Sequence, residues 1–201
     1  MGRQDLYLVA GFSVVALSMI MYMSSLQPLQ SGEDDSGSDQ IKSEVENLRD
    51  EIRRAANQEK NTTYDFDTEG LFIRFEGEAD IVQIEHSRDS KMYSSKWSLI
   101  SGTTLQGTSL GGGDFALDDL DNQSIIAAKS LPDSTSVYHI EFRETRNDTG
   151  SIQKIDIEES QTASNVRKIH INHTGTETVN VADSSGGKVQ RTEKAVRLVL
   201  N

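Results

Sequence analysis

Four carboxylates and a glycine between residues 65 and 76 fall on the spacing of a calcium-binding EF-hand loop. The stretch reads DFDTEGLFIRFE and matches the loop's ligand positions with Asp65, Asp67, Glu69 and Glu76, with Gly70 at the turn. Carboxylate oxygens are the ligands that Ca²⁺ prefers in proteins. The sequence therefore offers Asp65, Asp67 and Glu69 as candidate Ca²⁺ ligands, and Ca²⁺ is the one cofactor it suggests.

The same stretch also matches a β-strand. Residues 71–76 alternate between apolar and polar side chains, and Gly77 is followed by another strand-like segment where an EF-hand needs its second helix. Position 5 of the loop usually holds Asp or Asn, whereas this sequence has the longer Glu69. We therefore expect residues 65–70 to be the turn into a strand, with a cation bound by 65–69 as the alternative.

Other residues capable of chemistry lack a recognisable arrangement. His170 and His173 are three residues apart in a strand-like segment, so their side chains point to opposite faces. The acidic, glycine-rich stretch 101–123 indicates an exposed loop or insertion, which on a β-scaffold is a common place for contacts. The chain contains no cysteine, and no Ser–His–Asp motif has its usual context. The sequence predicts a protein that is not an enzyme.

The C-terminal two thirds of the chain predict a β-domain over 61–201. Short segments rich in Ile, Val, Phe and Tyr are separated by Gly, Asp, Asn and Ser. This pattern favours an antiparallel β-sandwich resembling a jelly roll. The segments are 71–76, 80–86, 96–100, 124–128, 136–142, 151–157, 167–171, 178–182 and 195–200.

A helix is predicted over 41–60, just before the β-domain. Its apolar residues recur at spacings of four and three, which is the seam of a coiled coil. In a parallel pair Glu44 would meet Arg49 of the other chain. One interpretation is a helical stalk that forms a homo-oligomer, and the other is an amphipathic helix packed on the chain's own β-domain. The seam residues are Ile41, Val45, Leu48, Ile52 and Ala55.

An uncharged apolar run near the N-terminus predicts a transmembrane helix over 6–26. A helix of this length reaches about 30 Å, the thickness of the bilayer's hydrocarbon core. Arg3 precedes the run, and no basic residue follows it before Lys42, so we expect residues 1–5 inside and the C-terminal domain outside. The polar, acidic residues 27–40 predict a flexible linker. A cleaved signal peptide is the alternative, but the run is long for one.

Composition narrows the choice of partners. The formal net charge is −12, which disfavours nucleic acid as a partner. Candidate N-glycosylation sites agree with an extracytoplasmic domain at the cell surface, in the periplasm or on the outer face of an internal virion membrane. These sites are Asn61, Asn122, Asn147 and Asn172.

The order of anchor, linker, helix and β-domain predicts a single-pass membrane-anchored structural protein. It would bind the lipid bilayer through 6–26 and fasten its β-domain to an outer layer, as a minor capsid component of a membrane-containing virion or part of a cell-surface assembly. One alternative is a carbohydrate-binding or adhesive module that uses Trp97, the only tryptophan. Another is an accessory subunit of envelope assembly or of a filament stator. The choice among these three functions rests on the order of the segments along the chain.

Overall fold

The computed structural model describes residues 36–87, 93–101, 124–146, 150–182 and 187–201. The predicted transmembrane segment 6–26, residues 1–5 and most of the acidic stretch 101–123 lie outside the described residues. Within the described part of the chain, no helix is both long and apolar enough to cross a bilayer.

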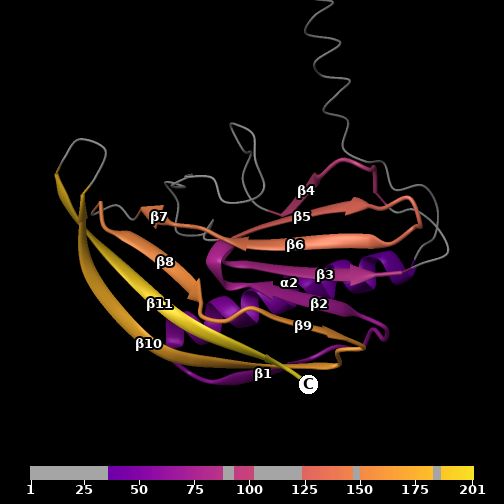
Figure 1. Cartoon of the computed structure of the whole chain (residues 1–201), viewed down its shortest axis with the longest axis horizontal. Helices are drawn as coiled ribbons and strands as arrows, with labels where there is room; N and C mark the ends of the chain where they lie inside the picture. The colour runs from indigo at the N-terminus through magenta and orange to yellow at the C-terminus, as the bar shows by residue number, and fades with distance from the viewer. Residues whose placement is uncertain (1–35, 88–92, 102–123, 147–149, 183–186) are drawn as a thin grey trace, which may run out of the picture. The chain divides into compact units, whose positions relative to one another are not determined.

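A long helix precedes a series of strands (Figure 1). In chain order the elements are α2 (Ser36–Gln58), β1 (Thr62–Asp65), β2 (Phe72–Glu76), the 3-10 turn η1 (Gly77–Ala79), β3 (Ile81–His86), β4 (Ser98–Ser101), β5 (Ser124–Ser130), β6 (Ser136–Phe142), β7 (Thr145–Arg146), β8 (Ile152–Ile157), β9 (Gln161–Ser164), β10 (Lys168–Ala182) and β11 (Lys188–Leu200).

The strands form two sheets, which confirms that the chain is mainly β and agrees with a sandwich-like domain. Sheet A has the order β1-β10-β11-β8-β7, and sheet B has the order β4-β5-β6-β3-β2-β9. Neighbouring strands are antiparallel except β8 and β11, which pair in parallel with Ile152 opposite Arg191. The prediction of a purely antiparallel fold is therefore wrong at this pair.

Most strands lie where the sequence pattern predicts them, with two large differences. Strand β11 begins at Lys188, well before the predicted strand 195–200, and β10 is longer than predicted. The predicted strands 167–171 and 178–182 are parts of the single long strand β10, which passes through a register shift between His173 and Gly175. That shift lets the strand continue past a polar, glycine-containing stretch that resembles a turn in the sequence. The short strands β1, β7 and β9 were not predicted, because two to four residues carry little periodicity.

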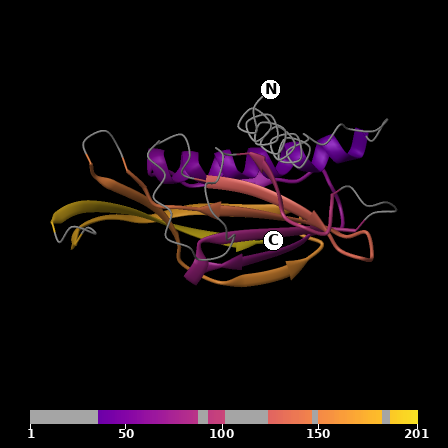
Figure 2. The ribbon, with the colours of Figure 1, turned by 90° about the horizontal axis from the view of Figure 1, so that it is seen from above.

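Helix α2 packs its apolar seam against the sheets of its own chain. All five predicted seam residues are buried within the single chain, and Ala56 joins them. Figure 2 shows α2 running along one face of the strands. Of the two interpretations of this helix, the structure agrees with the amphipathic helix packed on its own β-domain. Its seam is covered by the chain's own sheets. The helix begins at Ser36, so the last residues of the predicted linker 27–40 are helical.

The core is one continuous cluster between α2 and the inner faces of both sheets. In β6, Tyr138, Ile140 and Phe142 face this core, while Val137, His139 and Glu141 lie on the opposite face, as the alternation of a strand requires. Burying each large apolar side chain contributes about 1.5–3 kcal/mol. The sheet surface away from α2 is called here the outer face, and it carries apolar side chains such as Val137 as well as polar ones.

Candidate functional site

Sheets A and B are joined on the outer face by a group of residues that we call the inter-sheet junction. It consists of the charged residues Asp80, Lys154 and Asp156 together with Gly77 and Ile157, whose backbones meet there. Gly77 belongs to the turn η1 that precedes β3, and its absent side chain matters because a Cβ there would lie 2.6 Å from the carbonyl oxygen of Ile157. Only a glycine lets the sheet B backbone approach the end of β8 this closely.

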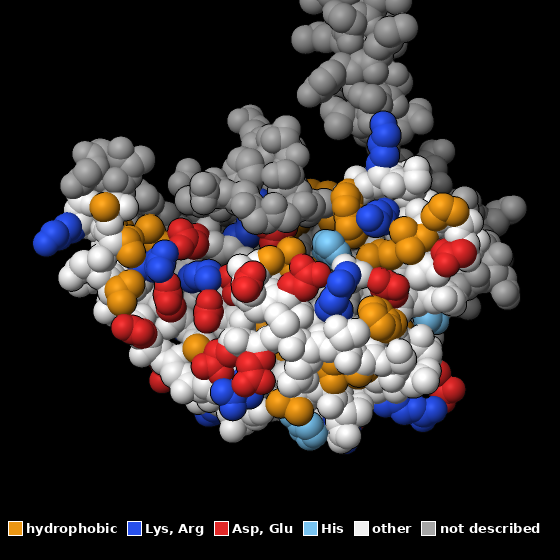
Figure 3. Space-filling model, in the orientation of Figure 1, with side chains coloured by type: hydrophobic (Ala, Val, Ile, Leu, Met, Phe, Trp, Pro, Cys, Tyr) orange, Lys and Arg blue, Asp and Glu red, His pale blue; other side chains and the backbone are white. Residues whose placement is uncertain are grey.

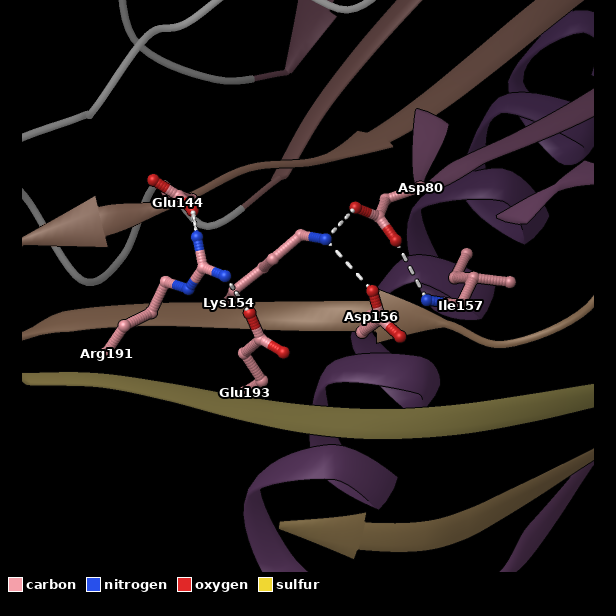
Figure 4. Close-up of polar contacts among 7 residues, drawn as sticks. All are labelled: Asp80, Glu144, Lys154, Asp156, Ile157, Arg191 and Glu193. Atoms are coloured by element: carbon pink, nitrogen blue, oxygen red, sulfur yellow. Dashed lines mark hydrogen bonds and ion pairs between the residues drawn. The ribbon is translucent and has the colours of Figure 1, made fainter. Parts of the chain in front are cut away.

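Asp80 connects the two sheets at this point. Its Oδ1 accepts a hydrogen bond from the backbone N–H of Ile157 at 2.9 Å, and its Oδ2 lies 2.8 Å from Nζ of Lys154 (Figure 4). Lys154 also reaches Oδ1 of Asp156 at 2.9 Å. Asp80 holds a left-handed backbone conformation with φ of 51°, which aims its side chain from the turn toward β8.

The balance between burial and hydrogen bonding differs for the two charges of this pair. Burial raises the pKa of Asp80, against the opposing hydrogen bonds from Lys154 and Ile157. Burial disfavours the charged form of Lys154 as well, but hydrogen bonds to Asp80 and Asp156 outweigh it and raise its pKa. The Asp80 side chain is 7% exposed and that of Lys154 is 23% exposed, so desolvation weighs more on the carboxylate. The pair connects the turn before β3 to strand β8.

A second group of charges continues along sheet A. Arg191 of β11 pairs with Glu144 at 2.9 Å and also with Glu193 (Figure 4). Figure 3 shows acidic and basic side chains interspersed over this face, with small hydrophobic groups between them. Within the junction, and likewise within this second group, most charges pair with a neighbour of opposite sign.

The outer face of sheet B carries an aromatic cluster. The ring of Trp97 lies 4.2 Å from that of His139, measured between centroids, and Nζ of Lys129 lies 4.4 Å from the centre of the Trp97 ring. Nε2 of His139 is 2.8 Å from Oε1 of Gln83, so the ring donates this hydrogen bond. Trp97 thus already uses its π-face for contacts within the chain.

His139 is held neutral by this environment. Burial, followed by the charges of Lys129 and Arg74, lowers its pKa to about 4. Its other ring nitrogen, Nδ1, is buried without a hydrogen-bond partner among the described residues, so a proton added there would find no acceptor. His139 is therefore a packing residue of the outer face at neutral pH.

The candidate calcium ligands lie at the end of β1 and in the loop that follows it, which α2 holds. Glu44 is buried, and its Oε1 accepts hydrogen bonds from the backbone N–H groups of Asp67 at 2.8 Å and Thr68 at 3.0 Å. Its carbonyl oxygen accepts a further hydrogen bond from the hydroxyl of Tyr64 at 3.0 Å. Burial, with the charge of Glu44 next, raises the pKa of Tyr64 to about 12. Glu44 therefore binds its own loop, whereas the prediction placed its side chain beside Arg49 of a second chain.

The three carboxylates themselves do not gather around a common point. Asp65 pairs with Lys168 at 3.0 Å, and Glu69 pairs with Arg167 at 2.6 Å. Among the described residues, no group of three or more His, Asp or Glu side chains could hold a metal ion. After these residues the chain enters β2, which agrees with the strand predicted over 71–76.

Two of the four predicted glycosylation sites lie in the described chain. Asn61 is exposed, but its Oδ1 accepts a hydrogen bond from the N–H of His173 at 3.0 Å. Asn172 lies within β10 and is half-buried. Asn122 and Asn147 lie outside the described residues.

The inter-sheet junction was not predicted from the sequence. Its members are far apart in the chain, and Asp80 resembles an ordinary turn residue before a strand. One local signal was present, since Lys154 and Asp156 put charges on alternate positions of a strand whose other face is apolar.

Comparison of the chain with known protein families, with curated proteins and with solved structures found no match.

Proposed function

We propose that this chain is a non-enzymatic, single-pass membrane-anchored structural protein that fastens its β-domain to an outer protein layer. The observation that carries the proposal is the uncharged apolar run 6–26, followed by acidic, polar residues and then by a folded β-domain. Such an order suits a module held at a short distance from a bilayer, as in the coat of a membrane-containing virion or in a cell-surface assembly.

The structure supports one part of this proposal, which is that the β-domain is a self-contained module. The seam of α2 is covered by its own sheets, and the charges of the inter-sheet junction pair with one another. A module whose helix needs no second chain for burial can be carried as a single copy on one anchor. Contacts with a partner would then use the outer face or the strand edges.

The carbohydrate-binding alternative depends on Trp97. A sugar ring would stack on the tryptophan face, but that residue packs against His139 and Lys129. Trp97→Ala should therefore lower the stability of sheet B, and we expect the wild-type protein to show no Trp97-dependent binding to a glycan array.

The proposal is tested by membrane fractionation of the full chain in its native host material. We expect the chain to stay with the membrane after washing with high salt and alkaline carbonate, and to be released by detergent. A matched variant without residues 6–26 should appear in the supernatant with its β-domain folded. Release of the full chain by salt or carbonate alone would contradict the anchor.

A further inference from the structure

Among the described residues, the strands at the edges of both sheets are short. At the four sheet edges, β1, β4 and β9 have 4 residues each and β7 has 2. Short edge strands are one way in which proteins avoid pairing with other chains. The long strand β10 differs, because β1 covers only its first part, residues 168–171.

Beyond β1, the same side of β10 remains open. The connection from α2 to β1 reaches the next part, since Asn61 accepts from the N–H of His173, and Glu59 accepts from the hydroxyl of Thr176 at 3.0 Å. From Glu177 to Ala182, the described residues place β11 on one side of β10 and no strand on the other. We call residues 177–182 the open edge.

The open edge has a composition that favours pairing. Its sequence is ETVNVA, which contains β-branched residues and neither proline nor lysine, the residues that usually protect an edge. On its outer face Val179 and Val181 are half-buried, and Val181 lies opposite Val189 of β11. An added strand could therefore gain both main-chain hydrogen bonds and apolar contacts.

The charge of Glu177 favours a partner with a basic side chain at this position. Glu177 lies directly opposite Glu193 in the register of β10 and β11, and like charges in such a pair repel. Arg191 pairs with Glu193, whereas Glu177 has no ion-pair partner among the described residues. A basic side chain placed beside Glu177 would relieve this repulsion.

We propose that the open edge binds an extended segment of a partner protein as an added antiparallel strand. The segment carries Lys or Arg beside Glu177 and apolar side chains beside Val179 and Val181. A second copy of this chain fits less well, because residues 177–182 contain no basic residue and the whole chain has a net charge of −12. The identification of the partner as the outer-layer protein rests on the proposed function, but the strand addition itself does not.

The test uses the full chain in detergent micelles and two synthetic peptides. In both, valine alternates with threonine, and the position that reaches residue 177 holds lysine in one peptide and glutamate in the other. Mass spectrometry measures the rate of amide hydrogen exchange with and without each peptide. We expect the lysine peptide to slow amide exchange over 177–182 and to bind several-fold more tightly than the glutamate peptide.

Charge-reversal variants decide whether Glu177 selects the partner. Glu177→Lys should reverse the preference, so that the glutamate peptide binds more tightly. Glu78→Lys is the matched control, because this substitution changes the net charge by the same amount at an exposed residue of η1. It should leave the preference between the peptides unchanged. Far-ultraviolet circular dichroism of each variant checks that the sheets are intact.

Three results would overturn the proposal: no slowing of exchange at 177–182 with either peptide, the same preference in both charge variants, or protection that appears without peptide as the protein concentration rises. The last result would assign the edge to a second copy. Because these readouts do not involve the bilayer, failure of the membrane fractionation alone would overturn the anchor and leave the strand addition standing.

Discussion

At the residue scale, Asp80 combines burial with contacts to two residues of strand β8 in the other sheet. Removing its carboxylate leaves the N–H of Ile157 without its acceptor and Lys154 with only the more exposed Asp156 as a partner. Asp80→Ala should therefore lower the free energy of unfolding by about 2–4 kcal/mol. Urea denaturation followed by circular dichroism measures this loss.

Asp156→Ala is the matched control for Asp80→Ala. The Asp156 side chain is 36% exposed and pairs with the same Lys154, so its loss should cost less than about 1 kcal/mol. Equal effects of the two substitutions would show that the junction does not depend on the buried carboxylate.

His139 gives a residue-scale prediction about pH. Its pKa is about 4 in the folded protein, against about 6.5 in an unfolded chain. Between these values the unfolded state binds more protons, so the contribution of His139 is present above pH 6.5 and is lost as the pH falls toward 4.

His139→Gln keeps a donor for Gln83 but cannot titrate. We expect the wild type to lose about 1–2 kcal/mol more than this variant between neutral pH and about pH 4.5, allowing for partial exposure of the ring. Parallel urea titrations of both proteins at the two pH values measure the difference. Identical pH dependences would rule out a depressed His139 pKa.

At the element scale, α2 fixes the loop that precedes β2. Glu44→Ala removes an acceptor of two backbone N–H groups, those of Asp67 and Thr68, and should destabilise the domain by about 2–3 kcal/mol. Among the described residues Glu46 on the same helix has no comparable contact, so Glu46→Ala should change stability by less than about 0.5 kcal/mol. Chemical denaturation compares the two, and an unaffected Glu44→Ala would show that the loop does not depend on α2.

Strand β11 has a central position in sheet A. It pairs with β10 on one side and β8 on the other, and it buries Val196 and Leu198. A chain ending before Val196 should fail to fold, because it loses the core contacts of the strand and the partner of β8. Loss of the sheet signal in circular dichroism and rapid exchange of the β8 amides are the expected readouts. A folded truncated domain would contradict this role for β11.

The periodicity of the sequence predicted strands of five to seven residues and the helix with its apolar seam, but only parts of the long strands β10 and β11. It could not decide what covers that seam, since spacings of four and three serve a partner helix and a sheet equally well. The burial of Leu48 against the sheets depends on strands that come much later in the chain. The inter-sheet junction escaped prediction for the same reason, because Asp80 and Lys154 meet only through the topology.

At the scale of the whole molecule, the proposed anchor and the β-domain have separate tasks. The apolar run 6–26 would bind the bilayer, and the domain over 36–201 is a compact unit with its own core. With the α2 seam covered, this domain should not self-associate through its helix. A partner is therefore expected at the outer face or at the open edge of β10.

Cross-linking mass spectrometry on the native membrane or particle tests this account most directly. The account predicts cross-links from the β-domain to a repeating coat or surface protein, including links from Lys188 and Lys194, which flank the open edge on β11. Links confined to the chain itself, or scattered among unrelated proteins, would contradict the proposal of a structural anchor.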